Sequence, residues 1–296
     1  MTATETRLWL VTGASRGLGR AFTEAALRNG DHVVATVRRA DALTDLAYEW
    51  GDRLIRRELD VTDRAAVTEV VDDIADTVGT PDVVVNNAGY GLVGATEEIS
   101  ETEARAQFDT NFFGALWVTQ AALPHMRAAG QGRIVQVSSV GAVGAMPFFG
   151  LYNATKWALE GFSAALAQEV APHGIGVHIL ELGGFATDWF GRSMRFADEN
   201  GAYNELRGGI FGAARYPDLS DASPAEQGED ATDAPPSVAA ESLLELLDLE
   251  DPPLRWVAGP AAKDMVRMAL EDRRDDYEKD PEFTWPSGSR AHDTPA

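Results

Sequence analysis

Residues 7–37 read RLWLVTGASRGLGRAFTEAALRNGDHVVATV, and this stretch decides the fold. The apolar run over residues 7–12 predicts a buried strand, and the run over 32–37 predicts another. Between them, a glycine-rich turn leads into a predicted helix over residues 21–29. Strand, turn, helix and strand in this order predict the first βαβ unit of a parallel sheet, because parallel neighbours are joined by a crossover.

The alternation of strands and helices continues to residue 181. Further apolar runs predict strands over residues 54–59, 82–86, 133–138 and 175–181. Apolar residues recur at three- and four-residue steps over 63–78, which predicts an amphipathic helix. A capping box of Ser100 and Glu103 begins a second helix, and a third is predicted over 152–171. The nearly unbroken apolar runs are typical of parallel strands with helices on both faces.

The character of the chain changes after Gly184. Residues 188–211 are rich in aromatic residues and methionine, and residues 216–236 are acidic. We expect 188–236 to form a partly helical insertion over the substrate, which we call the flap. A helix is predicted over 237–249 and a last edge strand over 254–258. A single domain is expected to span residues 1–279, with a flexible tail over 280–296.

Composition excludes several classes of protein and partner. The chain has 296 residues, 45% of them hydrophobic, and a net charge of -22. Such a charge repels nucleic acid and anionic membranes, and no apolar run is long enough to span a bilayer. Without cysteine, disulfides and thiolate metal sites are excluded. We expect a soluble, cytoplasmic protein.

Arginine is far commoner than lysine in this chain. There are 22 arginines and only three lysines, Lys156, Lys263 and Lys279. A GC-rich genome combined with an acidic surface explains this bias. The alternative is adaptation to high salt, which screens repulsion between surface carboxylates. Both readings stay open.

The glycine-rich turn, Thr12-Gly13-Ala14-Ser15-Arg16-Gly17-Leu18-Gly19, lies between the first strand and the first helix. A dinucleotide pyrophosphate binds at this position in doubly wound sheets, because the helix N-terminus offers free backbone N–H groups. Glycine permits the tight turn and the close approach of the backbone to the phosphates. Three glycines alone are weak evidence, but the strand–turn–helix setting supports this interpretation.

Six motifs, in this order, resemble the short-chain dehydrogenase/reductase family in its single-domain branch. They are the T-G-x-x-x-G-x-G turn, Asp60-Val61, Asn86-Asn87-Ala88-Gly89, Asn111, Ser138-Ser139 and Tyr152-x-x-x-Lys156, and they are followed by a segment that ends at Thr187. Within the family, the chain is most similar to NADP-dependent carbonyl reductases and to dehydrogenases of hydroxysteroids and retinol. The resemblance implies a Rossmann-type α/β fold, with a doubly wound parallel sheet of seven strands in the order 3-2-1-4-5-6-7.

The resemblance also implies which residues hold the dinucleotide. Asp60 would bond the adenine amino group beside the Val61 backbone, and the 87–89 turn would lie under the adenine ribose. Phe185 and Thr187 would hold the nicotinamide carboxamide. The full implied set is Gly13, Ser15, Arg16, Gly17, Leu18, Gly19, Arg38, Asp60, Val61, Asn87, Ala88, Gly89, Tyr152, Lys156, Phe185 and Thr187. One departure is Leu182, where the family usually has proline, which would fix the backbone before Gly183.

The charge at the end of the second strand favours NADP(H) over NAD(H). NAD enzymes of this architecture typically carry a carboxylate there for the ribose 2′-hydroxyl. Here the strand ends in Arg38 and Arg39, with no acid before Asp41. Arg16 is expected to point to the same place, and a guanidinium suits a 2′-phosphate. The alternative is that Arg38 and Arg39 are simply solvated.

Tyr152 and Lys156 are the expected catalytic pair. Four residues apart on a predicted helix, they share one face. We expect the ammonium and an oxidised nicotinamide together to lower the pKa of the phenol, so that Tyr152 exchanges a proton with the substrate oxygen. Ser139 is expected to hydrogen-bond that oxygen. The resemblance implies that Asn111 anchors a water linking Lys156 to solvent.

We therefore expect an oxidoreductase (EC 1.1.1.-) that transfers a hydride between NADP(H) and a small-molecule carbonyl or secondary alcohol. Alternatives are an NAD(H)-dependent alcohol dehydrogenase of the same fold, and a dinucleotide-binding regulator without catalysis. Epimerisation or dehydration is disfavoured, because relatives with those activities usually have a longer C-terminal domain and a G-x-x-G-x-x-G turn. The five histidines form no cluster, so no metal site is predicted.

Two further expectations concern apolar side chains. One group clusters in the flap: Trp189, Phe190, Met194, Phe196, Tyr203 and Phe211. If these residues line the pocket, the substrate is bulky and apolar; otherwise they pack a core within the flap. The resemblance implies a homodimer or homotetramer through helices at about 101–129 and 152–171, which would cover Trp117 and Trp157.

Overall fold

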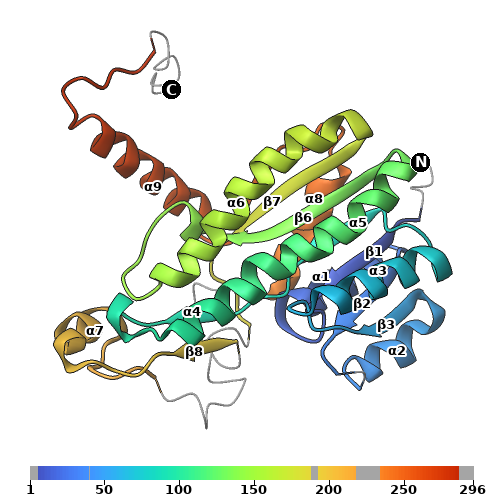
Figure 1. The fold of residues 1–296 in the computed structure, drawn as a ribbon, viewed down its shortest axis with the longest axis horizontal. Helices are drawn as coiled ribbons and strands as arrows, with labels where there is room; N and C mark the ends of the chain where they lie inside the picture. The colour runs from blue at the N-terminus through green and yellow to red at the C-terminus, as the bar shows by residue number, and fades with distance from the viewer. Residues whose placement is uncertain (1–5, 40, 188–192, 218–233, 287–296) are drawn as a thin grey trace.

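The computed structural model describes residues 6–39, 41–187, 193–217 and 234–286. One seven-stranded parallel sheet runs through it in the order β3-β2-β1-β4-β6-β7-β9 (Figure 1). These strands are β1 (Leu8–Thr12), β2 (His32–Val37), β3 (Leu54–Glu58), β4 (Val83–Asn86), β6 (Gly132–Ser139), β7 (Ile175–Leu182) and β9 (Arg255–Ala258). Counted along the chain, this is the predicted order 3-2-1-4-5-6-7, so the predicted fold class is confirmed.

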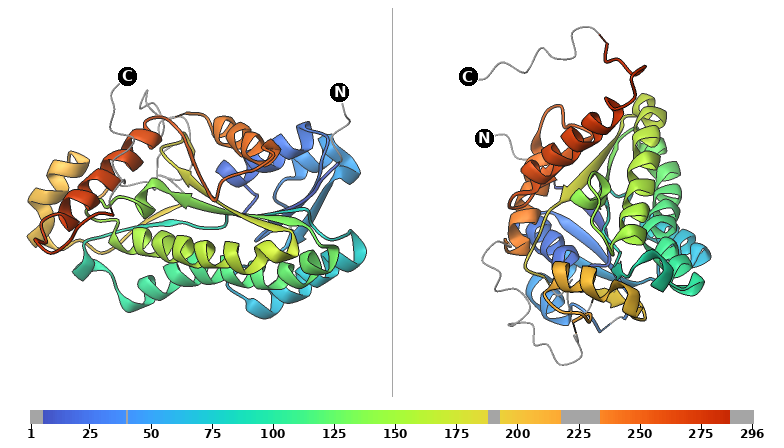
Figure 2. Two further views of the ribbon diagram at one scale, coloured as in Figure 1. Left: turned by 90° about the horizontal axis from the view of Figure 1, so that it is seen from above. Right: turned by 90° about the vertical axis from the view of Figure 1, so that its left-hand side faces the viewer.

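Helices cover both faces of the sheet (Figure 2). On one face lie α1 (Gly17–Arg28), α2 (Thr44–Trp50) and α8 (Pro236–Asp248). On the other lie α3 (Arg64–Thr77), α5 (Ala115–Ala129) and α6 (Gly150–Val170). Successive strand residues point to opposite faces, so Trp9 and Val11 pack with the first layer and Leu10 with the second. The two cores together fix the sheet between its helices.

Helix α5 is reached through a single turn of π-helix. The capping box of Ser100 and Glu103 begins α4 (Glu101–Phe108), as predicted. The π-helical turn η3 (Asp109–Gly114) then joins α4 to α5. Such turns are rare and frequently lie at functional sites. This one carries Asn111.

The flap takes part in a small sheet that the sequence did not predict, with one strand from the flap and one from the segment after β4. Its two parallel strands are β5 (Gly91–Val93) and β8 (Met194–Phe196), and α7 (Asn204–Phe211) follows. Phe148, from the loop before α6, is the centre of a core that the flap shares with the body of the protein, and the rings of Tyr203, Phe211 and Tyr216 pack around it. Met194, Phe196, Tyr203 and Phe211 all belong to this cluster. For these four residues the structure shows the core alternative, while Trp189 and Phe190 lie outside the described residues.

An ion pair without solvent contact holds this core to the body of the protein. Arg207 of α7 pairs with Glu98, and the exposed fraction of both side chains is 0%. The second oxygen of Glu98 accepts hydrogen bonds from the Tyr216 hydroxyl at 2.5 Å and from the Ala95 backbone at 2.8 Å. The Arg207 guanidinium also lies over the Tyr216 ring, 4.4 Å from its centroid. The pair fixes α7 against the segment that follows β5.

A C-terminal helix, α9 (Ala262–Tyr277), follows the last strand and was not predicted. It projects from the body beside the loop that precedes α6 (Figure 1). The start of the predicted tail packs on its end, where the rings of Tyr277 and Phe283 stack at 5.2 Å. Within the described ranges, no helix is both long and apolar enough to cross a membrane.

Replacing Arg207 by alanine should be strongly destabilising, because it leaves the Glu98 carboxylate buried without its partner. We expect the free energy of unfolding to fall by about 3–5 kcal/mol. Arg105→Ala is the matched control, since Arg105 pairs with Glu101 on an exposed helix surface and should cost only about 0–1 kcal/mol. Urea unfolding measures both, and equal losses would contradict a special role for the buried pair.

Candidate active site

The carboxyl ends of the parallel strands open onto one cavity of about 1170 Å³. Every residue that the sequence assigned to the dinucleotide lines it: Gly13, Ser15, Arg16, Gly17, Leu18, Gly19, Arg38, Asp60, Val61, Asn87, Ala88, Gly89, Tyr152, Lys156, Phe185 and Thr187. Ser139 lines it as well, whereas Asn111 does not. The cavity exceeds the roughly 300–1,000 Å³ usual for one ligand, so it has room for a dinucleotide and a substrate together.

The glycine-rich turn leaves the N-terminus of α1 open to the cavity. No side chain caps this helix end among the described residues, and its first turn has no acidic residue. Gly13 and Gly17 have φ values of 63° and 54°, in the left-handed region that favours glycine. Uncapped N–H groups and the positive end of the helix dipole suit a pyrophosphate. The residues present therefore fit a dinucleotide.

Two loops at this edge approach too closely for any side chain between them. A Cβ added to Gly19 would lie 2.4 Å from both the Asn87 amide nitrogen and the Gly13 carbonyl oxygen. Asn87 Nδ2 donates to the Thr12 carbonyl at 2.9 Å. The Thr12 hydroxyl accepts from the backbone N–H groups of Asn87 at 3.0 Å and Ala88 at 3.1 Å. These bonds join the glycine-rich turn to the loop after β4.

The three arginines near the second strand differ in their surroundings. Arg39 binds Asp41 through two hydrogen bonds, at 3.0 and 2.7 Å, and does not line the cavity. Arg38 lines the cavity and has no ion-pair partner among the described residues. The Arg16 guanidinium donates to the Ser193 hydroxyl at 2.8 Å, which ties the turn to the flap. Of Arg38 and Arg39, Arg38 is thus the one that lines the cavity.

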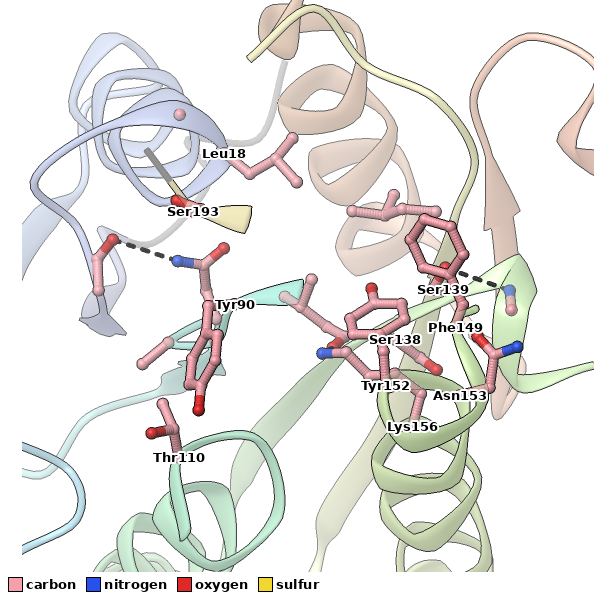
Figure 3. Close-up of a pocket in the computed structure, with 18 of the residues that line it drawn as sticks. Leu18, Tyr90, Thr110, Ser138, Ser139, Phe149, Tyr152, Asn153, Lys156 and Ser193 are labelled. Carbon is pink, nitrogen blue, oxygen red and sulfur yellow. Dashed lines mark hydrogen bonds between the residues drawn. The ribbon is translucent and has the colours of Figure 1, made fainter. Parts of the chain in front are cut away.

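The predicted catalytic pair, Tyr152 and Lys156, lies on α6, with Ser139 opposite at the end of β6 (Figure 3). Tyr152 and Ser139 share a hydrogen bond through their hydroxyl groups. The Ser139 oxygen also accepts from the backbone N–H of Gly141 at 3.1 Å. Lys156 Nζ lies 5.9 Å from the centre of the Tyr152 ring and donates to the Val137 carbonyl at 2.8 Å. The sequence-predicted trio is therefore brought together in one place.

Burial is the main cause of the pKa shifts of Tyr152 and Lys156. It raises the pKa of Tyr152 to about 12, against the opposing effect of the Ser139 hydrogen bond. Burial also lowers the pKa of Lys156 to about 8, while the nearby Glu160 carboxylate acts in the opposite direction. The expectation that the phenol pKa falls is not met by the protein's own groups, because desolvation of the phenolate outweighs the Ser139 hydrogen bond.

The two adjacent serines have different surroundings. Ser138 is buried and donates to Glu160 Oε1 at 2.8 Å, and Glu160 lies one helical turn beyond Lys156. Arg255 reaches the other oxygen of this carboxylate at 3.2 Å. The Ser138 hydroxyl is thus occupied by its hydrogen bond to Glu160. The Ser139 hydroxyl instead contacts the Tyr152 hydroxyl. This geometry favours Ser139 as the residue that contacts a substrate.

Asn111 holds the loop that follows Gly89. Its Oδ1 accepts from the Tyr90 N–H at 3.0 Å, and its Nδ2 donates to the Tyr90 carbonyl at 2.9 Å and to the Thr155 hydroxyl at 3.2 Å. Gln107 donates to the same Tyr90 carbonyl at 2.7 Å. The side chain is 1% exposed and occupied by these contacts. Its predicted role in anchoring a water stays a prediction.

The sequence missed one wall of the cavity. Its residues are Val143, Met146, Trp157, Met265, Met268, Ala269, Asp272 and Arg273. Five of them belong to α9, and Trp157 was expected to face a second subunit. No local motif marks these positions, because they meet only when α9 folds back beside the loop before α6.

Comparisons with known proteins agree with this geometry. The family described as short chain dehydrogenase matches residues 7–196. Oxidoreductase BOA17 of Botryotinia fuckeliana is 40% identical over 267 residues, covering 90% of this chain and 93% of its own. The crystal structure of a short-chain dehydrogenase from Streptomyces avermitilis is 40% identical, with a TM-score of 0.81, and covers 94% of this chain and 97% of its own.

A third relative has a dinucleotide in its crystal structure. The closed form of a serine dehydrogenase, complexed with NADP+, is 25% identical to this chain. Its TM-score is 0.71, with 86% of this chain and 95% of that chain covered. The protein described here is an oxidoreductase whose chain belongs to the short-chain dehydrogenase family.

Gly19→Ala should weaken dinucleotide binding at least tenfold, because the added Cβ overlaps backbone and forces the two loops apart. Gly161→Ala is the matched control, since a Cβ there meets nothing within 4 Å and alanine is the better helix former by about 1 kcal/mol. Fluorescence titration with NADPH measures binding, and circular dichroism checks the fold. Unchanged affinity in Gly19→Ala would show that the close approach is not required.

Proposed function

We propose that this protein transfers a hydride between NADP(H) and the carbonyl or secondary alcohol carbon of a bulky, apolar small molecule. The observation that carries the proposal is the hydroxyl pair of Ser139 and Tyr152. It lies beside Lys156 in the same cavity as the open helix end and the glycine-rich turn. Ser139, Tyr152 and Lys156 are proposed as the catalytic residues, with Asn111 positioning the loop at Tyr90.

Side chains of the protein transfer the proton to and from the substrate oxygen. When bound, the nicotinamide ring supplies or accepts the hydride. In reduction, Ser139 donates a hydrogen bond to the carbonyl oxygen, and Tyr152 gives its proton to that oxygen as the alcohol forms. The Lys156 ammonium stabilises the phenolate left behind, which is then reprotonated from solvent. In oxidation, the same phenolate accepts the alcohol proton.

The preference for NADP(H) is proposed from Arg38. Arg38 lines the cavity at the carboxyl end of β2, where a 2′-phosphate would lie, and within the described part of the chain no carboxylate forms an ion pair with it. The NADP+ complex of the serine dehydrogenase relative supports this choice. Assembly into a homodimer or homotetramer stays a prediction. The stacked rings of Phe113 and Trp117, at 5.6 Å, are the surface feature that favours it.

Tyr152→Phe should lower kcat for ketone reduction by about 10²–10⁴, because the transferable proton is lost while the ring packing is kept. The affinity for NADPH should stay close to wild type. Ser139→Ala should also lower kcat with little effect on NADPH binding. Lys156→Ala should lower kcat and also weaken NADPH binding. Steady-state kinetics and fluorescence titration separate these effects. Tyr48→Phe is the control, since Tyr48 is 95% exposed; an active Tyr152→Phe enzyme would refute the assignment.

The reduction rate should fall as pH rises through about 8. Below the Lys156 pKa of about 8 the ammonium is charged and stabilises the developing phenolate; above that pH the amine is neutral and this support is lost. The measurement is the pH profile of kcat with saturating NADPH. A reduction rate that climbs steadily from pH 7 to 9 would contradict the proposed role of the lysine charge.

NADPH should bind at least tenfold more tightly than NADH, a difference of about 1.4 kcal/mol. Arg38→Asp should shift the preference towards NADH, because a carboxylate repels the 2′-phosphate and accepts the ribose hydroxyl. Arg39→Asp is the matched control, since Arg39 already binds Asp41 outside the cavity. Equal affinity of the wild-type protein for both cofactors would overturn this assignment.

A further inference from the structure

The cavity continues past the catalytic tyrosine to the wall that the sequence missed. Phe149 lies against Tyr152 edge to face, with ring centroids 6.5 Å apart. The remaining large apolar side chains of this wall are Met146, Trp157, Met265 and Met268. They come from the loop before α6, from α6 itself and from α9. Three separate segments thus bring apolar side chains to one surface next to the reaction centre.

These apolar side chains are far more exposed than a packed core allows. The exposed fraction is 47% for Met146 and for Trp157, 50% for Met265 and 63% for Met268. A patch of this kind inside a concave site is typical of a ligand-binding surface. Methionine is unbranched and flexible, so a wall rich in it can adapt to a flexible ligand.

Helix α9 is anchored where it forms this wall. Arg273 donates to the Val143 carbonyl at 2.6 Å, and its guanidinium lies 4.3 Å from the centre of the Trp157 ring. At Gly144 the loop passes so close to α9 that an added Cβ would lie 3.3 Å from Ala269 Cβ. The helix is therefore held against the start of the loop that carries Met146 and against Trp157 of α6, and its methionines line the cavity.

The chemistry of the wall favours a neutral hydrocarbon over a sugar or an acid. Methionine, tryptophan, phenylalanine and valine side chains offer almost no partners for hydroxyl groups, which would lose hydrogen bonds on burial. The Arg273 guanidinium is already stacked on Trp157 and bonded to Val143. Asp272, also on the wall, would repel a carboxylate.

We propose that α9 and residues 143–149 form a chain-binding subsite that takes the long hydrocarbon part of a neutral ketone or secondary alcohol. The inference rests on the proposed function, because that function places the reacting carbonyl at Tyr152. Each methylene group fully buried in the subsite should tighten binding about fourfold, since burying one contributes about 0.8 kcal/mol. Affinity should therefore rise with chain length until the subsite is filled.

The test uses the full-length protein and the alkan-2-ones from butan-2-one to dodecan-2-one. Calorimetry in the presence of NADP+, which cannot reduce a ketone, gives Kd for each length, and steady-state kinetics with NADPH gives KM. The wild-type Kd should fall at least a hundredfold between butan-2-one and decan-2-one. In the double variant Met265→Ser/Met268→Ser, the ratio of the Kd for butan-2-one to the Kd for decan-2-one should be at least tenfold smaller than in the wild type. In Met265→Leu/Met268→Leu this ratio should stay at the wild-type value.

Leu270→Ser is the matched control on the same helix. Leu270 is 51% exposed but does not line the catalytic cavity, so this variant should keep the wild-type dependence on chain length. An equal loss in Leu270→Ser would overturn the subsite, because the effect would then come from α9 as a whole.

Two further outcomes separate the subsite from the proposed function. A wild-type Kd that does not change with chain length overturns the subsite, and it is the result expected if a second copy of the chain covers the wall. Tighter binding of long ketones without turnover of any of them supports the subsite and refutes the proposed reaction.

Discussion

The active site depends on the close approach of two loops at the carboxyl edge of the sheet. Gly19 and the Thr12 carbonyl lie directly against the Asn87 side chain, with no space for a Cβ at Gly19. This contact sets the turn after β1 and the loop after β4 in one orientation, and it leaves the N-terminus of α1 facing the cavity. A dinucleotide bound there is held by backbone N–H groups, whose positions the sheet fixes.

Burial of the proposed catalytic pair is a second constraint, and it follows from the packing of α6 on the sheet. Tyr152 is 9% exposed and Lys156 6%. In this environment the neutral forms of both groups are favoured. The lysine charge is supported by its bond to the Val137 carbonyl and by Glu160 one turn away. A positive charge brought in with a cofactor would therefore lower the pKa of the Tyr152 phenol.

Sequence alone determined the sheet and the dinucleotide end of the site. The apolar runs and their order specify parallel strands and crossovers, because each βαβ unit has one favoured handedness. The glycine-rich turn and the Tyr152–Lys156 spacing are local patterns, and their residues meet through one turn or one helix face. All sixteen residues assigned to the dinucleotide line the observed cavity. Those outside these two patterns were assigned through the family resemblance, and they meet because parallel strands end at one edge of the sheet.

Only the tertiary structure decided the rest of the cavity wall. Arg38 and Arg39 are equivalent in the sequence, yet only Arg38 lines the cavity. Three described aromatic residues of the flap, Phe196, Tyr203 and Phe211, could have faced the pocket, but they pack in the core around Phe148, which the buried pair of Arg207 and Glu98 joins to the body. Helix α9 contributes its methionines from beyond the residues that match the family. Such contacts join segments that are distant in the chain, so no local pattern of residues records them.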